Sequence, residues 1–166
     1  LAEKNRRYTR EKYLSLLEYA YSVMPELSVT SDVIVGFPGE TYEEFRETVS
    51  LVQQANFTSM YTFIFSPREG TKAASMPDPV SREEKGRWFK ELLDAQEVIA
   101  AKRTASAVGK GYRVLCESVS RGGLIEGRTE GNVIVEFPAD SSVIGTFRNV
   151  KVTESLTWIL RGELAD

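Results

Sequence analysis

The chain has 166 residues, of which 42% are hydrophobic and 27% are charged, and its formal net charge is −3. This length allows one ordinary domain or two small ones, and no apolar run approaches the roughly 20 residues that cross a bilayer, so we expect a soluble, cytoplasmic protein with no membrane partner. The chain has no histidine and a single cysteine, Cys116, which excludes a histidine general base, an intrachain disulfide and a zinc or iron–sulfur site built from its own thiolates.

The first 65 residues alternate between helix and strand patterns. A helix is predicted over 10–24, capped by Thr9. Its apolar face comprises Tyr13, Leu16, Leu17, Ala20, Tyr21 and Met24. Buried strands are predicted over 28–36 and 60–65, with an amphipathic helix between them. Such alternation indicates a parallel α/β sheet, and two strands are too few to form one alone, so we expect a fragment of a larger α/β domain.

A glycine turn follows the first predicted strand, within the stretch SDVIVGFPGET at residues 31–41. Gly36 and Gly39 allow a ligand to approach the backbone, and the helix that follows offers free amide groups. The pattern is neither Gly-x-Gly-x-x-Gly nor a P-loop, so the residues alone favour an ordinary strand-to-helix turn. The nearby carboxylates lie at a helix start, where the helix dipole favours acids, and we interpret them as structural. They are Glu40, Glu43, Glu44 and Glu47, and Glu44 forms a predicted capping box with Thr41.

The pattern changes from helix to strand near residue 106. A Pro-rich segment at 76–79 precedes a long helix that is predicted to continue to about residue 105. The alternating segments that follow predict a small five-stranded β-barrel of the OB type. Its predicted strands span 112–116, 124–130, 132–137, 143–152 and 156–164. We therefore expect an α/β part over 1–80, a connecting helix over 81–106 and a β-barrel over 107–166.

Basic and aromatic side chains of the predicted barrel form a candidate RNA-binding face, as in other OB-type barrels. The basic candidates are Arg121, Arg128, Arg148, Lys151 and Arg161, and the stacking candidates are Tyr112, Phe137 and Trp158. Region 107–166 nevertheless carries seven basic and eight acidic residues, so an ordinary solvated surface stays open as an interpretation. Cys116 lies in an alternating strand, and we interpret it as a buried core thiol.

Five motifs resemble, in order and in spacing, the C-terminal part of the radical-SAM tRNA methylthiotransferase family. They are NRRYTR at 5–10, SDVIVGFPGET at 31–41, YTFIFSPREGTKAASMPD at 61–78, GRTEGNVIVEF at 127–137 and VIGTFRNVKVTESLTWILRGEL at 143–164. Together they cover nearly the whole chain. GRTEGN and LRG resemble the branch of the family that acts on tRNA adenosine more than the branch that modifies a ribosomal protein.

The resemblance implies a fragment of a tRNA-modifying enzyme. Family members convert N(6)-isopentenyladenosine beside the anticodon to its 2-methylthio derivative, with S-adenosylmethionine (SAM) and two 4Fe–4S clusters. Residues 1–80 would be part of a radical-SAM partial (β/α) barrel, and 107–166 would be a TRAM domain that binds the tRNA anticodon stem-loop. The six cluster cysteines would lie before Leu1. We therefore expect no catalytic or metal-binding residue here, no activity of the chain alone, and the N-terminal domains of the same polypeptide as partners.

The family's binding residues map onto two groups of positions. The resemblance implies SAM contacts from Ile34, Gly36, Gly39, Phe65 and Ser66, and RNA contacts from Arg121, Arg128, Thr129, Asn132, Lys151 and Arg161. Asn132 has a second interpretation, because Gly131-Asn132 is a favourable tight-turn pair.

The chain departs from the family at three positions. Glu69 and Lys72 stand where proline is usual, and Glu136 stands where asparagine is common. Glu136 puts a negative charge near the proposed RNA face, so Phe137 is left out of the RNA-contact set.

The residues also bear on two other functions. A non-catalytic module that binds a protein partner through the β-barrel stays open. A complete small nucleotide-binding enzyme is excluded, because the chain lacks a general base, a metal site and a phosphate-binding loop. Two strands cut from a larger sheet would leave edges and the side chains of Ile34, Phe63 and Phe65 uncovered, so we also expect self-association.

Overall fold

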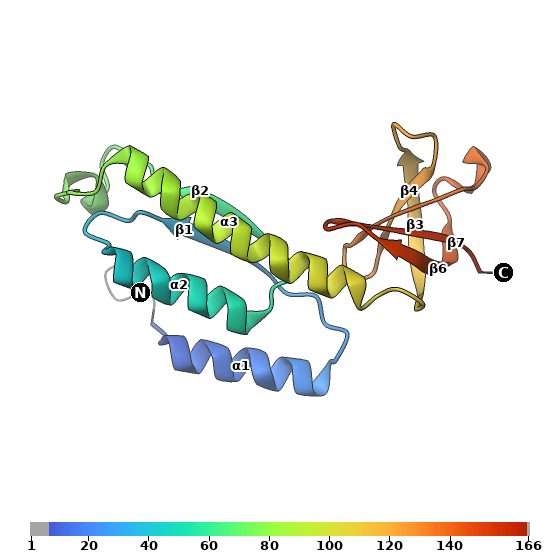
Figure 1. Cartoon of the computed structure of the whole chain (residues 1–166), viewed down its shortest axis with the longest axis horizontal. Coiled ribbons are helices and arrows are strands. Elements are labelled where there is room, and N and C mark those ends of the chain that lie inside the picture. Colours follow the sequence, from blue (N-terminus) through green and yellow to red (C-terminus); the bar gives the residue numbers. More distant parts are fainter. Residues whose placement is uncertain (1–6, 166) are drawn as a thin grey trace. The chain divides into compact units, whose positions relative to one another are not determined.

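The computed structural model describes residues 7–165, so the start of the motif at 5–10 lies outside the described residues (Figure 1). The chain divides into two compact units, residues 1–99 and 100–166, and each has its own hydrophobic core. The division lies within the long helix α3 (Arg82–Ala105), whereas the sequence places the boundary near 106. None of the described helices is long and apolar enough to span a membrane.

The first unit alternates helices with two strands. Its elements are α1 (Arg10–Val23), β1 (Thr30–Val35), α2 (Tyr42–Ala55), β2 (Ser59–Ile64), the 3-10 helix η1 (Lys72–Ser75) and the first part of α3. The two strands pair in parallel, with Thr30 opposite Ser59 and Val35 opposite Ile64. The order of the elements and the parallel pairing agree with the predicted α/β arrangement.

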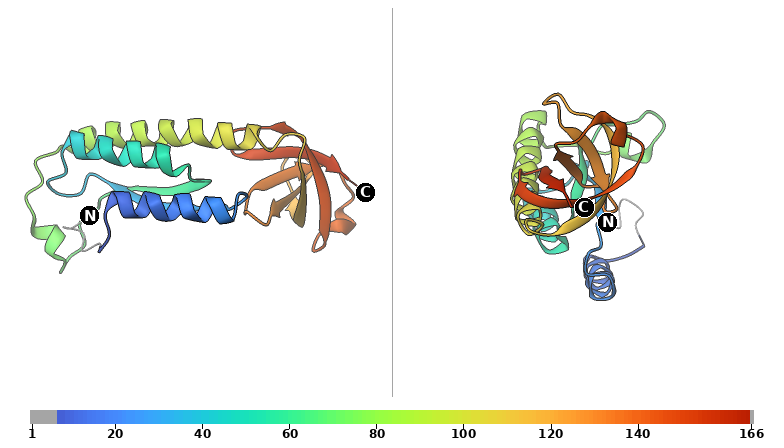
Figure 2. Two further views of the ribbon diagram at one scale, coloured as in Figure 1. Left: turned by 90° about the horizontal axis from the view of Figure 1, so that it is seen from below. Right: turned by 90° about the vertical axis from the view of Figure 1, so that its right-hand side faces the viewer.

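Helices α2 and α3 pack on one face of this two-stranded sheet (Figure 2). Phe45 of α2 is fully buried, and its ring stacks on Trp88 of α3 with the centroids 5.4 Å apart. Alternation along the strands sends Ile34, Tyr61 and Phe63 to the opposite face, where they are 45%, 64% and 53% exposed. The first unit therefore has a core on one side of its sheet, and these apolar side chains are largely uncovered on the other.

Helix α1 buries a narrower stripe than its sequence predicts. Leu17 is buried, and the Tyr21 hydroxyl donates a hydrogen bond to the carbonyl oxygen of Ala55 on α2 at 3.1 Å. Leu16 and Met24, predicted on the same buried face, are 62% and 50% exposed. The prediction is wrong for these two residues because α1 packs along α2, and a contact between two helices covers only a narrow stripe.

The second unit is a closed barrel of five strands. The strands are β3 (Gly111–Val119), β4 (Ile125–Thr129), β5 (Ile134–Phe137), β6 (Phe147–Ser155) and β7 (Ile159–Leu164), with the 3-10 helix η2 (Ser141–Val143) before β6. Their order around the barrel is β3-β4-β5-β7-β6, with β5 and β7 parallel and the other pairs antiparallel. Closure of five strands confirms the predicted barrel, although residues 143–146, predicted as strand, precede β6.

Two glycines allow the barrel strands to approach closely. A Cβ atom at Gly127 would lie 2.4 Å from the Leu115 carbonyl oxygen, and one at Gly162 would lie 2.5 Å from the Lys151 carbonyl oxygen. The partner strands β3 and β6 each carry a register shift beside these positions. Bulges bend strands, so the paired glycines and bulges supply the curvature that closes a small barrel.

Candidate nucleic-acid interface and strand-end site

The turn after β1 accepts only glycine at position 36. Gly36 has a φ of +72°, and a Cβ atom there would lie 2.6 Å from Cδ of Lys85. Lys85 comes from α3, is 5% exposed and forms an ion pair with Asp78. The aliphatic part of a buried lysine therefore fills the space that the missing side chain leaves, and α3 is fixed against the strand end.

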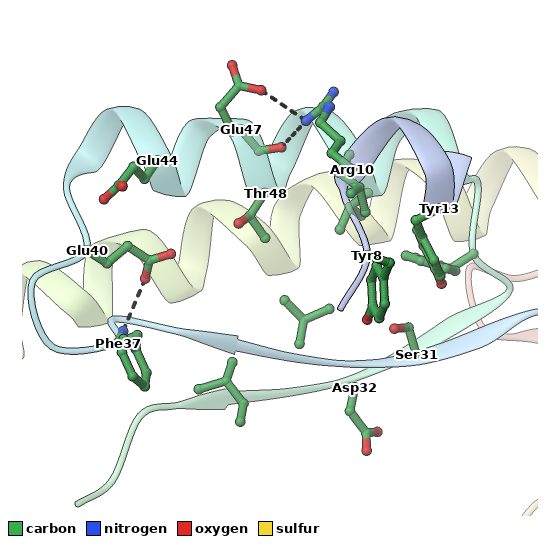
Figure 3. Close-up of a pocket in the computed structure, with 15 residues that line it drawn as sticks. Tyr8, Arg10, Tyr13, Ser31, Asp32, Phe37, Glu40, Glu44, Glu47 and Thr48 are labelled. Atoms are coloured by element: carbon green, nitrogen blue, oxygen red, sulfur yellow. Dashed lines mark hydrogen bonds and ion pairs between the residues drawn. The ribbon is translucent and has the colours of Figure 1, made fainter. Parts of the chain in front are cut away.

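The carboxylates near this turn have structural partners (Figure 3). Oε2 of Glu40 accepts hydrogen bonds from the amides of Gly36 at 2.5 Å and Phe37 at 3.2 Å. Thr41 and Glu44 form the predicted capping box of α2. Glu47 pairs with Arg10 at 3.1 Å. The structural interpretation is thus confirmed for Glu40, Glu44 and Glu47. Glu40 occupies two amides of the turn, and the capping box occupies the amides of Thr41 and Glu44 at the start of α2.

The residues that the resemblance assigns to SAM lie at or just after the C-terminal ends of β1 and β2. The Phe65 amide donates to the Val35 carbonyl oxygen at 2.8 Å, which uses the only backbone donor of Phe65. The rings of Phe65 and Phe37 meet edge to face with centroids 5.3 Å apart. Gly39 and Ser66 lie in exposed loops after the strands. The arrangement offers an apolar edge formed by Ile34 and the two rings, and Ile34 and Phe37 also line a neighbouring cavity.

A cavity of about 430 Å³ lies between the start of α1, helix α2 and strand β1 (Figure 3). Its apolar lining includes Val33, Leu51 and Phe57. Tyr13 also lines it, and burial raises the pKa of its hydroxyl. Arg10 is bound to α2 by the Glu47 carbonyl oxygen at 2.5 Å and the Ser50 hydroxyl at 3.0 Å. Arg10, Glu40, Glu44 and Glu47 are thus all bonded within the fold. These four side chains do not present an acid–base pair to the cavity.

In the barrel, Arg128 is held in place by two neighbours. Its Nε lies 3.1 Å from a carboxylate oxygen of Glu117, and its Nη1 donates to Oδ1 of Asn132 at 3.1 Å. Asn132 has a φ of +61°, which supports its interpretation as a turn residue. Thr129 is 8% exposed and its hydroxyl accepts a bond from the Val133 amide at 3.1 Å. Thr129 therefore stabilises the turn. Its contact with RNA stays a prediction, and the burial of its side chain argues against it.

The other basic candidates are distributed around the barrel. Arg161 on β7 lies 3.7 Å from Glu136 and 3.5 Å from Glu154. Lys151 on β6 pairs in register with Glu163. Arg121 is exposed in the loop between β3 and β4. Arg161 thus lies near two carboxylates and Lys151 lies opposite one, and the basic residues do not form the single face expected from the sequence.

Outward side chains form two rows that cross neighbouring strands. One row contains Phe147, Leu115, Arg128, Ile134 and Ile159, each opposite the next in register. The other contains Glu126, Glu136, Arg161 and Glu154. OB-type barrels usually bind nucleic acid on their second and third strands, here β4 and β5, yet Glu126 and Glu136 lie opposite each other there. The first row is the more favourable surface for an anion.

The aromatic candidates separate by burial. Phe137 is fully buried in the barrel core, so the prediction that it is a stacking group is wrong. Trp158, in contrast, is 49% exposed in the loop before β7. The aromatic candidates from the sequence did not include Phe147. Along β6 it alternates with the inward-facing Val150 and Val152, so it lies on the same outward face as Asn149 and Lys151. The strand alternation is the signal that would have identified it.

Cys116 lies in the barrel core. Its side chain is 1% exposed, and burial raises the pKa of the thiol. The interpretation as a core thiol is confirmed. Among residues 7–165, no group of three histidine, cysteine, aspartate or glutamate side chains is placed to hold a metal ion.

Comparison with protein families matches residues 105–165 to the TRAM domain. The whole chain is 42% identical to a tRNA-2-methylthio-N(6)-dimethylallyladenosine synthase of Thermoanaerobacter sp. (strain X514), of which it covers 36%. Proteins of the same name from Geobacillus kaustophilus (strain HTA426) and Symbiobacterium thermophilum are 44% and 40% identical over 97% and 100% of the chain. The chain spans about a third of the length of these curated relatives. The resemblance to the tRNA methylthiotransferases is thereby confirmed.

Proposed function

We propose that this chain, a homologue of the tRNA-2-methylthio-N(6)-dimethylallyladenosine synthases along its whole length, supplies RNA binding to a tRNA methylthiotransferase. The observation that carries the proposal is the TRAM domain, which folds here as a closed five-stranded barrel with Arg128 on its surface. The substrate would be a tRNA anticodon stem-loop, with N(6)-isopentenyladenosine next to the anticodon as the modified base. The barrel would hold this RNA while chemistry takes place elsewhere in the enzyme.

Arg128 is suited to bind a phosphate group. A guanidinium group binds phosphate through paired hydrogen bonds, and Glu117 and Asn132 fix its orientation beforehand. The side chains of Arg128 and Glu117 are each 38% exposed, so their ion pair is worth little and a phosphate can replace the carboxylate.

The first unit would contribute one side of the SAM site in the same enzyme. Ligands of parallel α/β folds bind at the C-terminal ends of the strands, where Ile34 and Gly36 lie. Ile34 and Phe65 offer an apolar surface against which an adenine could pack, and the residues present fit that group on this side. SAM supplies the radical-initiating and methyl-donating chemistry when bound. We expect the chain alone to show no measurable affinity for SAM, because the remaining walls are not formed by these residues.

Iron–sulfur clusters do not fit the residues present. The chain has one cysteine, which is buried in the barrel core, and a 4Fe–4S cluster requires several thiolates. We propose that the enzyme's clusters are held outside these 166 residues, that the chain by itself does not catalyse methylthiolation, and that it acts together with the cluster-binding domains.

Fluorescence anisotropy with a labelled anticodon stem-loop tests the RNA-binding proposal. We expect binding at low salt that weakens steeply at moderate salt, as counterions compete for the phosphates. Arg128→Glu should weaken binding and reduce the slope of log K against log salt by about one. Arg46→Glu is the matched control, because Arg46 belongs to the first unit and its side chain is 58% exposed. Absence of binding at low salt, or equal losses in both variants, would contradict the proposal.

A further inference from the structure

We propose that Phe147 and Arg113 form a stacking platform for one unpaired base of the RNA, beside the phosphate contact of Arg128. The inference rests on the RNA-binding function proposed above and adds two residues that neither the motifs nor the comparisons assign to it. The guanidinium of Arg113 lies over the Phe147 ring, with its central carbon 4.0 Å from the ring centroid. This is the geometry of a cation–π contact, which fixes both side chains before any ligand binds.

Both side chains of the platform reach solvent. Phe147 is 48% exposed at the start of β6, and the Arg113 side chain is 57% exposed on β3. Phe147 is absent from the buried cluster of the barrel and from the half-buried residues packed on it. An aromatic ring outside the core gains little from folding, whereas unpaired bases stack readily on aromatic rings and on guanidinium planes.

The strand register places the platform next to Arg128. Leu115 on β3 lies opposite Phe147 on β6 and opposite Arg128 on β4. Phe147 and Arg128 are thus two strand spacings apart, about 10 Å, with a half-buried leucine between them. A nucleotide whose phosphate lies on Arg128 can therefore place a neighbouring base on Phe147 without a change in the barrel.

The charges around the platform make this surface more favourable for RNA than other surfaces of the barrel. Among the described residues, Arg113 forms an ion pair with Glu130 at 3.7 Å, and the Glu130 side chain is 78% exposed. Arg128 has Glu117 as its carboxylate partner. Such exposed pairs contribute little and exchange easily with phosphate. On β4 and β5, by contrast, Glu126 and Glu136 lie opposite each other and would repel a phosphate backbone.

A stem-loop carrying 2-aminopurine at single loop positions tests the platform with the whole 166-residue chain. Phe147→Leu removes the ring, keeps an apolar side chain and removes no charge. We expect about tenfold weaker binding, because stacking of one base on an aromatic side chain has that order of effect. Fluorescence quenching at one loop position should be lost, and the salt slope should stay unchanged. Phe147→Trp should retain both affinity and quenching.

Two further variants complete the test. Arg113→Lys keeps the charge but loses the planar group, so we expect reduced quenching with a small change in salt slope. Tyr19→Leu removes an aromatic side chain that is 66% exposed on α1 and should change nothing. A stem duplex without unpaired bases should bind wild type and Phe147→Leu equally.

The outcomes separate this inference from the function on which it depends. If Arg128→Glu loses RNA while Phe147→Leu binds and quenches as wild type, the platform is overturned and RNA binding stands. If the wild-type chain does not bind the stem-loop at low salt, the proposed function and the platform both fail, and an exposed arginine–aromatic pair would then point to a protein partner. Equal weakening of the paired duplex by Phe147→Leu also overturns the platform, because a paired stem offers no base to stack.

Discussion

The two units differ in whether their β-sheets have unpaired edges. In the barrel, every strand has a neighbour on both sides, because β3 pairs with both β4 and β6. In the first unit, β1 and β2 pair with each other in a two-stranded sheet whose open face carries Ile34, Tyr61 and Phe63. The barrel therefore has no open sheet edge, while the sheet of the first unit leaves one face largely uncovered. A hydrophobic core can thus form on one face of a sheet while the other face stays exposed.

Core truncations test most strongly whether the two units are independent. Phe45→Ala and Phe137→Ala each remove a fully buried ring, one from each unit, and we expect each to lower the free energy of unfolding of its own unit by about 3–5 kcal/mol. Urea unfolding followed through Trp88, buried in the first unit, and Trp158, in the barrel, can be separated in single-tryptophan variants. A shift of both transitions by one truncation would contradict independence.

Closure of the barrel is tested by its glycines. Gly127→Ala places a Cβ atom against the Leu115 carbonyl oxygen, which is backbone and cannot move aside, so we expect a loss of about 2–3 kcal/mol in barrel stability. Gly122→Ala is the matched control, because its nearest contact, the Ser120 hydroxyl, is 3.8 Å away. Thermal unfolding of the two variants measures the difference. Equal stability would show that close approach of β3 and β4 is not required.

The open sheet face is tested by adding charge to it. Phe63→Lys places a cation among exposed apolar side chains, and we expect it to reduce concentration-dependent self-association while leaving the fold intact. Sedimentation velocity over a wide concentration range measures the effect, with Tyr19→Lys on α1 as the control. A wild-type chain that stays monomeric throughout would contradict the expectation that this face associates.

The buried thiol gives the smallest effect. Burial raises the pKa of Cys116 in the folded chain. The thiol therefore contributes fully to the free energy of unfolding below the pKa of an unfolded thiol, about 8.5. This contribution is lost as the pH rises through the higher pKa of the folded state. We expect slow reaction with a thiol reagent at pH 8, at a rate set by opening of the barrel. Fast labelling of the native chain would show that the Cys116 region opens readily.

Much of the fold could be predicted because hydrophobic periodicity and turn residues act locally. The helix starting near Thr41, the parallel strands and the five barrel strands follow from such patterns. Leu16 and Met24 were misplaced because the width of a buried stripe depends on the partner element, which periodicity does not contain. Residues 143–146 were misassigned because the apolar side chains of Val143 and Ile144 suit a strand as well as the end of η2 and the turn that follows it.

The candidate site was harder to predict, because registers and ion pairs link residues far apart in the chain. Arg128 and Arg161 are both arginines, and the sequence does not distinguish their roles. In the structure, Asn132 orients Arg128, whereas Arg161 lies near the carboxylates of Glu136 and Glu154. The contact of Arg113 with Phe147 joins residues 34 positions apart on neighbouring strands. The strand register, which the sequence leaves open, decides such contacts.

Hydrogen exchange with and without the anticodon stem-loop tests directly whether the barrel binds RNA on the surface around Arg128 and Phe147. We expect slower exchange of barrel amides in 111–119, 125–133 and 147–149 when RNA is present, with exchange in β1 and β2 unchanged. Protection confined to the first unit, or protection centred on β5 and β7 around Glu136 and Arg161, would contradict the proposed RNA surface.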